Sequence, residues 1–130
     1  MDKIGLVSRT PMTTTVLVVD DHVGFRIRIR RLLERYGYRV VEAADGRAGV
    51  LLSADVRPDI ALVDIHLPDL DGFEVASLLR AARSTQTIVL TSTHRSDDYR
   101  ERLATSDADG FIDKADLTAS SIALIAGRRR

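Results

Sequence analysis

The sequence predicts one α/β domain, built as a doubly wound sheet of five parallel strands. Short apolar runs recur along the chain, and they are unbroken rather than alternating, which is typical of strands covered by helices on both faces. Segments with apolar residues at helical spacing separate these runs. Strands that alternate with helices favour right-handed crossovers and a parallel sheet. The length of 130 residues is that of a single domain.

Five segments are predicted as strands. Three are strong apolar runs that end in polar residues: 16–19 before Asp20 and Asp21, 60–63 before Asp64, and 87–90 before Thr91. Two weaker runs cover 39–43 and 110–112. In open α/β sheets ligands bind beyond the carboxyl ends of the strands, so the residues that end these runs are candidates for a site.

Five segments are predicted as helices. The first runs from Phe25 to Tyr36 with its apolar residues on one face, and Gly37 stands where a C-terminal glycine belongs. Arg57-Pro58 closes the second helix, and the third opens near Asp71-Gly72. The fourth extends from about Asp97 to Thr105 and the fifth from about 116 to 126. Apolar residues mark the second, third and fourth of these helices: Ala48, Leu51 and Leu52; Val75, Leu78, Leu79 and Ala82; Tyr99 and Leu103.

The composition excludes several classes of function. The chain has no cysteine, which excludes disulfides, thiolate metal sites and cysteine nucleophiles, and fits a reducing compartment. Nineteen basic residues balance nineteen acidic ones, whereas nucleic-acid binders normally carry a basic excess. No apolar segment has the length of a signal peptide or a membrane span, so we expect a cytoplasmic protein with no membrane contact. Residues 1–14 are predicted as a flexible arm and 128–130 as a basic tail.

Three acids are expected to converge if the first and third strands are neighbours. Asp20 and Asp21 end one strand and Asp64 ends the other. Two like charges about 4 Å apart repel by about 1 to 4 kcal/mol, so such acids either raise their pKa values or hold a cation. Oxygen ligands favour a hard ion such as Mg²⁺. The alternative for Asp21 is that its side chain caps the first helix.

A hydroxyl and a cation are expected at the same edge. Thr91 ends the fourth strand and Lys114 follows the fifth. The chain uses arginine almost everywhere, and its only other lysine is Lys3. A lysine and a hydroxyl opposite carboxylates form a cradle for a phosphoryl group.

Four motifs in order make the chain resemble the receiver domain of bacterial two-component response regulators, of the chemotaxis-regulator type. They are VLVVDDH at 16–22, ALVDIHLPDLDG at 61–72, VLTS at 89–92 and GFIDK at 110–114. Asp64, Pro68 and Gly72 reproduce the family spacing after its third strand. The resemblance implies a flavodoxin-like (βα)5 fold with strand order 2-1-3-4-5, and a receiver domain over 15–127.

The resemblance also implies a chemistry. Asp64 is the expected phosphoacceptor, whose carboxylate attacks the phosphohistidine of a sensor histidine kinase or a phosphotransfer protein to form an acyl phosphate. Asp20 and Asp21 are expected to hold Mg²⁺ or Mn²⁺ together with Asp64 and the backbone carbonyl of His66. The protein is then a phosphoacceptor that assists its own phosphoryl transfer and dephosphorylation, rather than an enzyme.

The same resemblance implies a switch. Thr91 is expected to bond a phosphoryl oxygen and to move on phosphorylation, Lys114 to pair with the phosphate, and Phe111 to be the aromatic switch residue. Loading the site then changes the surface of the fourth helix, fifth strand and fifth helix, where a downstream protein partner binds. A homodimer that forms on phosphorylation is a further expectation, and direct contact with nucleic acid is not expected.

Other site types are weighed against this interpretation. The chain has no glycine-lysine phosphate loop, which excludes a P-loop NTPase. The stretch DLDG at 69–72 resembles a calcium loop, but Leu67 and Leu78 stand where acidic ligands are needed. The loop after the first strand lacks the hydroxyl residues that take a flavin phosphate. His22, His66 and His94 have scattered spacing, which favours surface histidines over a transition-metal site.

Two further alternatives concern the output. A receiver-like module could act in protein contacts without phosphorylation. The chain ends directly after the predicted fifth helix, which predicts a stand-alone receiver; if the native gene continues, the chain is instead the N-terminal fragment of a DNA-binding response regulator. Arginines on and after the first helix form a basic face that is expected to be solvated, and the resemblance adds kinase docking on this side: Arg26, Arg28, Arg30, Arg31, Arg35 and Arg39.

Overall fold

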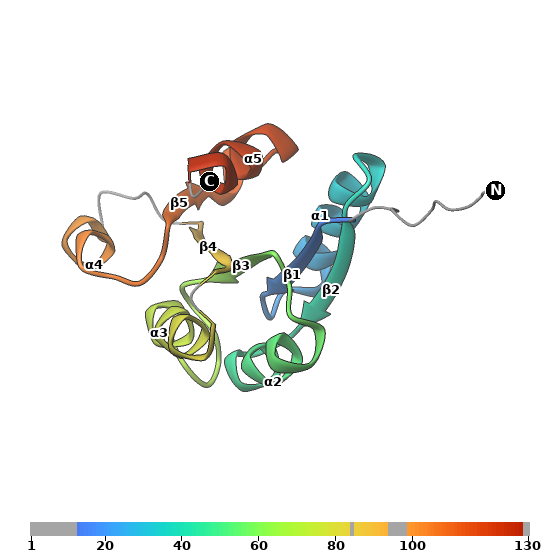
Figure 1. The fold of residues 1–130 in the computed structure, drawn as a ribbon. Coiled ribbons are helices and arrows are strands. Elements are labelled where there is room, and N and C mark those ends of the chain that lie inside the picture. Colours follow the sequence, from blue (N-terminus) through green and yellow to red (C-terminus); the bar gives the residue numbers. More distant parts are fainter. Residues whose placement is uncertain (1–12, 84, 94–98, 129–130) are drawn as a thin grey trace.

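Five parallel strands form one sheet in the order β2-β1-β3-β4-β5. The structure is a computed structural model and describes residues 13–83, 85–93 and 99–128. The strands are β1 (Thr15–Val19), β2 (Arg39–Ala43), β3 (Ile60–Asp64), β4 (Thr87–Ser92) and β5 (Gly110–Asp113). This order is that of the flavodoxin-like fold, so the predicted fold class and strand order are confirmed (Figure 1).

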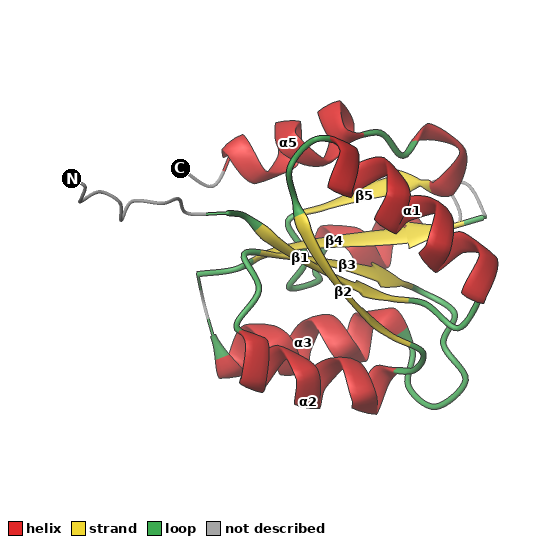
Figure 2. Cartoon of the chain, turned by 90° about the vertical axis from the view of Figure 1, so that its right-hand side faces the viewer, coloured by secondary structure: helices red, strands yellow, loops and turns green. Residues whose placement is uncertain are grey.

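Helices cover both faces of the sheet. They are α1 (Val23–Arg35), α2 (Gly46–Val56), α3 (Gly72–Ala82), α4 (Arg100–Ala104) and α5 (Ala119–Arg128), with a 3₁₀ helix η3 (Lys114–Asp116) after β5. Figure 2 shows α1 and α5 on one face, and α2 and α3 on the other. Within the described part of the chain, no helix has the length and apolar character that crossing a membrane requires.

The core consists of two clusters, one on each side of the sheet. Val16 and Val18 of β1 belong to the cluster under α1 and α5, whereas Leu17 and Val19 belong to the cluster that includes residues of α3. Successive side chains of a strand point to opposite faces. Residues 16–19 of β1 are completely buried, which explains why they form an unbroken apolar run.

The predicted apolar face of α2 is wrong at Ala48 and Leu51, which are exposed, whereas Leu52 is half-buried and packs against the core as predicted. Leu51 is 73% exposed, and the helix buries Gly46, Gly49 and Ser53 instead. A Cβ atom on Gly49 would lie 2.8 Å from the Val19 Cγ2 atom. The helix therefore approaches β1 so closely at Gly49 that a larger residue does not fit at that position, while Val50 and Leu52 pack beside it.

The other helices follow the predicted patterns in part. Ile29 and Leu33 of α1 are buried, but Tyr36 is exposed because it lies at the end of the helix, before the left-handed Gly37. In α3, Val75 and Leu79 pack inward. The predicted face is wrong at two positions, since Leu78 and Ala82 are exposed.

The predicted boundaries of the last two helices also need correction. Residues 97 and 98 of the predicted fourth helix lie outside the described residues, and α4 ends at Ala104, one residue earlier than predicted. The fifth helix does not begin at Asp116, which belongs to η3. It begins at Ala119, because the Thr118 hydroxyl accepts a hydrogen bond from the Ser121 backbone N–H and starts a new helix there (3.0 Å).

Of the predicted arm at 1–14 and the predicted tail at 128–130, residues 1–12 and 129–130 lie outside the described residues, and Arg128 is the last residue of α5.

Candidate functional site

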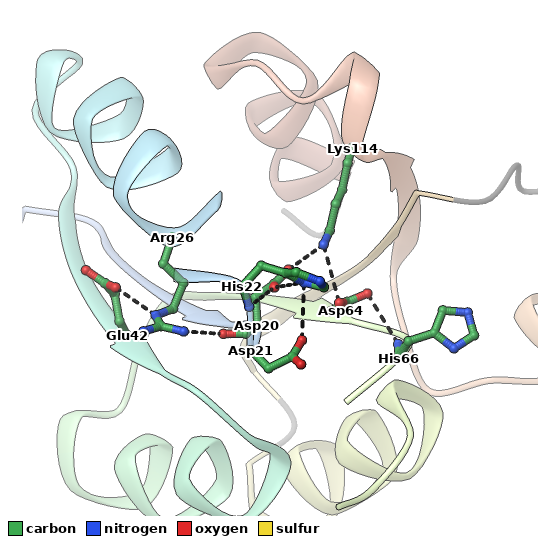
Figure 3. Close-up of polar contacts among 8 residues, drawn as sticks. All are labelled: Asp20, Asp21, His22, Arg26, Glu42, Asp64, His66 and Lys114. Atoms are coloured by element: carbon green, nitrogen blue, oxygen red, sulfur yellow. Dashed lines mark hydrogen bonds and ion pairs between the residues drawn. The ribbon is translucent and has the colours of Figure 1, made fainter. Parts of the chain in front are cut away.

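The acids predicted to converge do so at the carboxyl edge of the sheet. Strands β1 and β3 pair directly, with Val19 opposite Val63, so Asp20 and Asp64 end neighbouring strands. Both carboxylates are buried, whereas Asp21 is exposed. Donor atoms from Asp20, Asp21 and Asp64, together with one from His22, all lie within 4.8 Å of one another. Figure 3 shows them at one site.

Lys114 reaches into this site from the start of η3. Its Nζ atom lies 2.7 Å from the Asp20 Oδ2 atom and 3.3 Å from the Asp64 Oδ2 atom (Figure 3). The side chain is only 8% exposed, and Nζ also lies 4.4 Å from the centre of the Phe25 ring. The lysine therefore places one positive charge between the two buried carboxylates.

Asp64 is electrostatically strained. Burial raises the pKa of its carboxyl group, and the negative charge of Asp20 raises it further. Lys114 and the backbone N–H of His66, which donates to Asp64 Oδ1 at 3.2 Å, lower the pKa but offset only part of this effect. A second cation beside Asp64 would stabilise its ionised form.

Thr91 stands opposite Asp64 in the sheet. The two residues are register partners in the β3–β4 ladder, so their side chains lie on the same face. Thr91 is 1% exposed, and its Oγ1 atom has no hydrogen-bond partner among the residues that the structure describes. Buried hydroxyl groups are normally hydrogen-bonded, so the Thr91 hydroxyl is available to donate a hydrogen bond to an oxygen atom of a ligand that enters the site.

A second layer of charged residues supports the acidic loop, and the sequence did not reveal it. The Arg26 guanidinium donates one hydrogen bond to the Asp20 carbonyl oxygen (2.7 Å) and another to Glu42 Oε1 (2.9 Å). Glu42 also pairs with Arg30. The sequence predicted that Arg26 and Arg30 belong to a solvated basic face. Instead, both side chains pair with Glu42. Glu42 lies on β2, sixteen positions from Arg26, and only the pairing of β1 with β2 brings them together.

The histidines differ in their surroundings. His22 Nδ1 lies 3.1 Å from Asp20 Oδ1 and 3.2 Å from Asp21 Oδ1, although the residue is exposed. His22, not Asp21, is the N-cap residue of α1, and it makes no side-chain cap. The capping alternative for Asp21 is therefore wrong. The position of His22 directly after two acids is the signal that could have placed it in the site. His94 lies outside the described residues.

His66 connects the site to a group of aromatic rings. Its Nε2 atom is hydrogen-bonded to the Tyr99 hydroxyl at 2.6 Å. The Tyr99 ring centre lies 6.3 Å from that of Phe111 and 6.3 Å from that of Phe73. Phe111 is half-buried. These rings link the loop after β3 to the residue that precedes α4.

The acids of the calcium-like stretch have structural roles. Asp69 accepts hydrogen bonds from the backbone N–H groups of Gly46 and Arg47, at 2.8 and 2.9 Å. Asp71 forms a capping box with Glu74 at the start of α3. Neither acid belongs to the group of metal-ligand candidates found in the described part of the chain.

Comparison with known proteins agrees with this architecture. The chain matches the response regulator receiver domain family over residues 16–122. It is 38% identical to the response regulator MprA of Mycolicibacterium vanbaalenii over 105 residues, which are 79% of this chain and 45% of MprA. The chain spans about half the length of the curated relatives it matches.

Solved structures show the same fold. A two-component response regulator of the LuxR family from Aurantimonas sp. SI85-9A1 superposes with a TM-score of 0.78 at 31% identity, covering 89% of this chain and 87% of that one. The chemotaxis protein CheY4 of Vibrio cholerae superposes with a TM-score of 0.80 at 25% identity, covering 92% of this chain and all of that one. The chain belongs to the response regulator receiver domain family of two-component systems.

Proposed function

We propose that this receiver accepts a phosphoryl group on Asp64 from the phosphohistidine of a sensor histidine kinase or a phosphotransfer protein. The observation that carries the proposal is the position of Asp64, a buried carboxylate between two further acids and a buried lysine. The receiver domain is expected to span 15–127 and to act in the cytoplasm. It is a phosphoacceptor in signal transduction and not an enzyme with turnover.

The transfer uses the side chains described above. An Asp64 carboxylate oxygen forms the new P–O bond as the P–N bond of the donor breaks, and the imidazole nitrogen of the donor keeps the bonding electron pair. Lys114, now shared between Asp20 and Asp64, supplies a positive charge for the phosphoryl oxygens. The buried Thr91 hydroxyl donates a hydrogen bond to one of them.

The donor set also fits a divalent cation. Carboxylates of Asp20, Asp21 and Asp64, with the backbone carbonyl of His66, would hold Mg²⁺ or Mn²⁺. The raised pKa of Asp64 supports this assignment, because burial and the Asp20 charge leave its ionised form in need of a cation. When bound, the ion neutralises charge on the carboxylates and the phosphoryl oxygens.

The output is a change of surface. Thr91 lies opposite Ile112 in the β4–β5 ladder, and Ile112 follows Phe111, whose ring lies near Tyr99. We expect a movement of Thr91 toward the phosphoryl group to shift this part of β5 and, with it, the contact between Phe111 and Tyr99. Tyr99 directly precedes α4, so this change reaches the surface formed by α4, β5 and α5. A downstream protein partner, or a second copy of the phosphorylated protein, is expected to bind there.

Incubation with acetyl phosphate and Mg²⁺, followed by intact-protein mass spectrometry, tests the proposal. We expect the mass to rise by one phosphoryl group, and the Asp64→Ala variant to show no gain. A wild-type protein without the gain, or a variant with the same gain, would overturn it. A chain that neither gains the group nor binds Mg²⁺ would be a receiver-like module that acts without phosphorylation.

A second candidate extends the first. The curated relatives are about twice as long as this chain, and one is the transcriptional regulatory protein AfsQ1 of Streptomyces coelicolor. These lengths favour a regulator in which the receiver precedes a DNA-binding domain. Sequencing the native gene beyond the codon for Arg130 decides this: an in-frame continuation supports a transcription factor, and a stop codon supports a stand-alone receiver.

A further inference from the structure

We infer that the imidazole of His22 is itself a ligand in the cation site, which then prefers Mn²⁺ and other ions that accept nitrogen ligands over Mg²⁺. This inference rests on the proposed function, since it takes a divalent cation to bind beside Asp64. It adds a nitrogen donor that the family resemblance does not supply.

His22 is held at the site by its own backbone. Its N–H group donates to Asp20 Oδ1 at 2.9 Å, so the residue turns back toward the acids as α1 begins. In Figure 3 the imidazole lies between Asp20 and Asp21, on the side of Lys114. The ring nitrogen therefore faces the carboxylate oxygens of Asp20 and Asp21.

The separations between the donor atoms suit one octahedral ion. Ligand atoms that bind at right angles to each other, at about 2.1 Å from the ion, lie about 3.0 Å apart. His22 Nδ1 lies 3.1 Å from Asp20 Oδ1 and 3.2 Å from Asp21 Oδ1. One ion can therefore contact the nitrogen and both oxygens after small side-chain movements.

The chemistry of this donor set determines the choice of ion. Mg²⁺ binds oxygen ligands and keeps its waters, whereas Mn²⁺, Co²⁺, Ni²⁺ and Zn²⁺ accept imidazole more readily. As a ligand, Nδ1 is unprotonated and Nε2 carries the hydrogen. The His22 side chain is 66% exposed, so water can accept the Nε2–H bond and the ring has room to turn.

Pulsed EPR of bound Mn²⁺ tests the assignment, because electron spin echo modulation detects a nitrogen atom bonded to the ion. We expect nitrogen modulation in the wild-type protein and its loss in His22→Phe. We also expect the Mn²⁺ affinity of that variant to fall by about tenfold or more. Loss of an outer-sphere partner already costs that much, and loss of a direct ligand should cost at least as much. The Mg²⁺ affinity should fall less. Arg31→Gln, an exposed position on α1, is the control and should keep the nitrogen signal.

The outcomes separate this inference from the proposed function. Mn²⁺ bound without nitrogen modulation, or modulation that survives in His22→Phe, would show that His22 only donates a hydrogen bond to the acids. That result would leave the carboxylate site standing. Failure of the wild-type protein to bind either ion would instead refute the cation site and this inference together. Because the His22 side chain is mostly exposed, the variant is expected to fold, and circular dichroism checks this.

Discussion

At the scale of single residues, the site carries an electrostatic cost before any ligand arrives. Asp20 and Asp64 are buried beside each other, and Lys114 supplies one positive charge for two negative ones. The pKa of Asp64 is raised, mainly because the carboxyl group is buried and also because Asp20 is negatively charged. The carboxylate that we propose as the nucleophile is therefore less stable in its ionised form than an exposed aspartate.

The imbalance predicts how stability depends on pH. Folding raises the pKa of Asp64 above the ordinary value of 3.8, so the folded protein holds the proton more tightly than the unfolded chain. The contribution of Asp64 to the free energy of unfolding therefore falls as the pH rises through this window. A neutral asparagine at this position would carry no such penalty, so we expect Asp64→Asn to be more stable than the wild type at neutral pH without metal.

Urea denaturation in EDTA, between about pH 8 and about pH 4.5, measures this difference. The advantage of Asp64→Asn should shrink as the pH falls, because the wild-type carboxyl takes up its proton in the folded state. An advantage that grows toward acid pH would contradict the assignment.

Arg26 offers a second residue-scale prediction. It holds the Asp20 carbonyl and Glu42 at once, which fixes the backbone of the acidic loop. We expect Arg26→Gln to weaken Mg²⁺ or Mn²⁺ binding by about tenfold, as losses of outer-sphere partners commonly do. Calorimetric titration measures the affinity. Arg31→Gln, an exposed position on the same helix, is the matched control and should change it little. Equal effects of the two variants would refute the positioning role.

At the scale of elements, the segment between β3 and α3 packs tightly against the end of the strand that carries Asp64. The Gly72 backbone N–H bonds to the Ile65 carbonyl at 2.8 Å, so α3 begins directly against the end of the strand. A Cβ atom at Gly72 would lie 2.5 Å from the Asp64 carbonyl oxygen and 2.7 Å from the Ile65 Cα atom. Both are backbone atoms and cannot rotate away.

Gly72→Ala is therefore expected to destabilise the protein by about 1 to 3 kcal/mol, as overpacking does, and to slow phosphoryl transfer to Asp64. Gly24→Ala is the matched control, since a Cβ atom there meets nothing within 4 Å. Because Gly24 lies in α1, alanine should stabilise that variant by up to about 1 kcal/mol. Urea denaturation and the rate of mass gain with acetyl phosphate measure both effects. A silent Gly72→Ala variant would refute the crowding.

At the scale of the whole molecule, one site joins residues from β1, β3, β4 and the segment after β5. Asp20 and Lys114 directly follow β1 and β5, Asp64 ends β3, and Thr91 is the last residue but one of β4. The sheet order places these strand ends side by side, and unfolding separates them. A ligand of the site therefore stabilises the whole fold rather than one loop.

Cation binding should consequently raise global stability. At a free Mg²⁺ or Mn²⁺ concentration of about ten times Kd, the gain is about 1.4 kcal/mol. Thermal unfolding with and without the ion measures it, and EDTA should reverse it. In Asp20→Asn the shift caused by the ion should be much smaller, because one buried ligand is lost. An equal shift in that variant would place the ion elsewhere.

Much of this molecule follows from local patterns in its sequence. The five strands, the parallel sheet and the convergence of Asp20, Asp21 and Asp64 were predicted from apolar runs and the polar residues that end them. These predictions succeed because burial on both faces of a sheet demands unbroken apolar runs. The strand ends then place the polar residues at one edge, whatever the details of packing.

Only the tertiary structure decided the contacts between distant segments. The sequence placed Leu51 on the packed face of α2, but Leu51 is exposed, and the helix approaches β1 so closely at Gly49 that no larger side chain fits there. It placed Arg26 on a solvated face, whereas the pairing of β1 with β2 brings Glu42 to it. The spacing of apolar residues along the sequence indicates which side chains are buried. It does not record how closely two elements approach or which charges meet, because these depend on the complete packed fold.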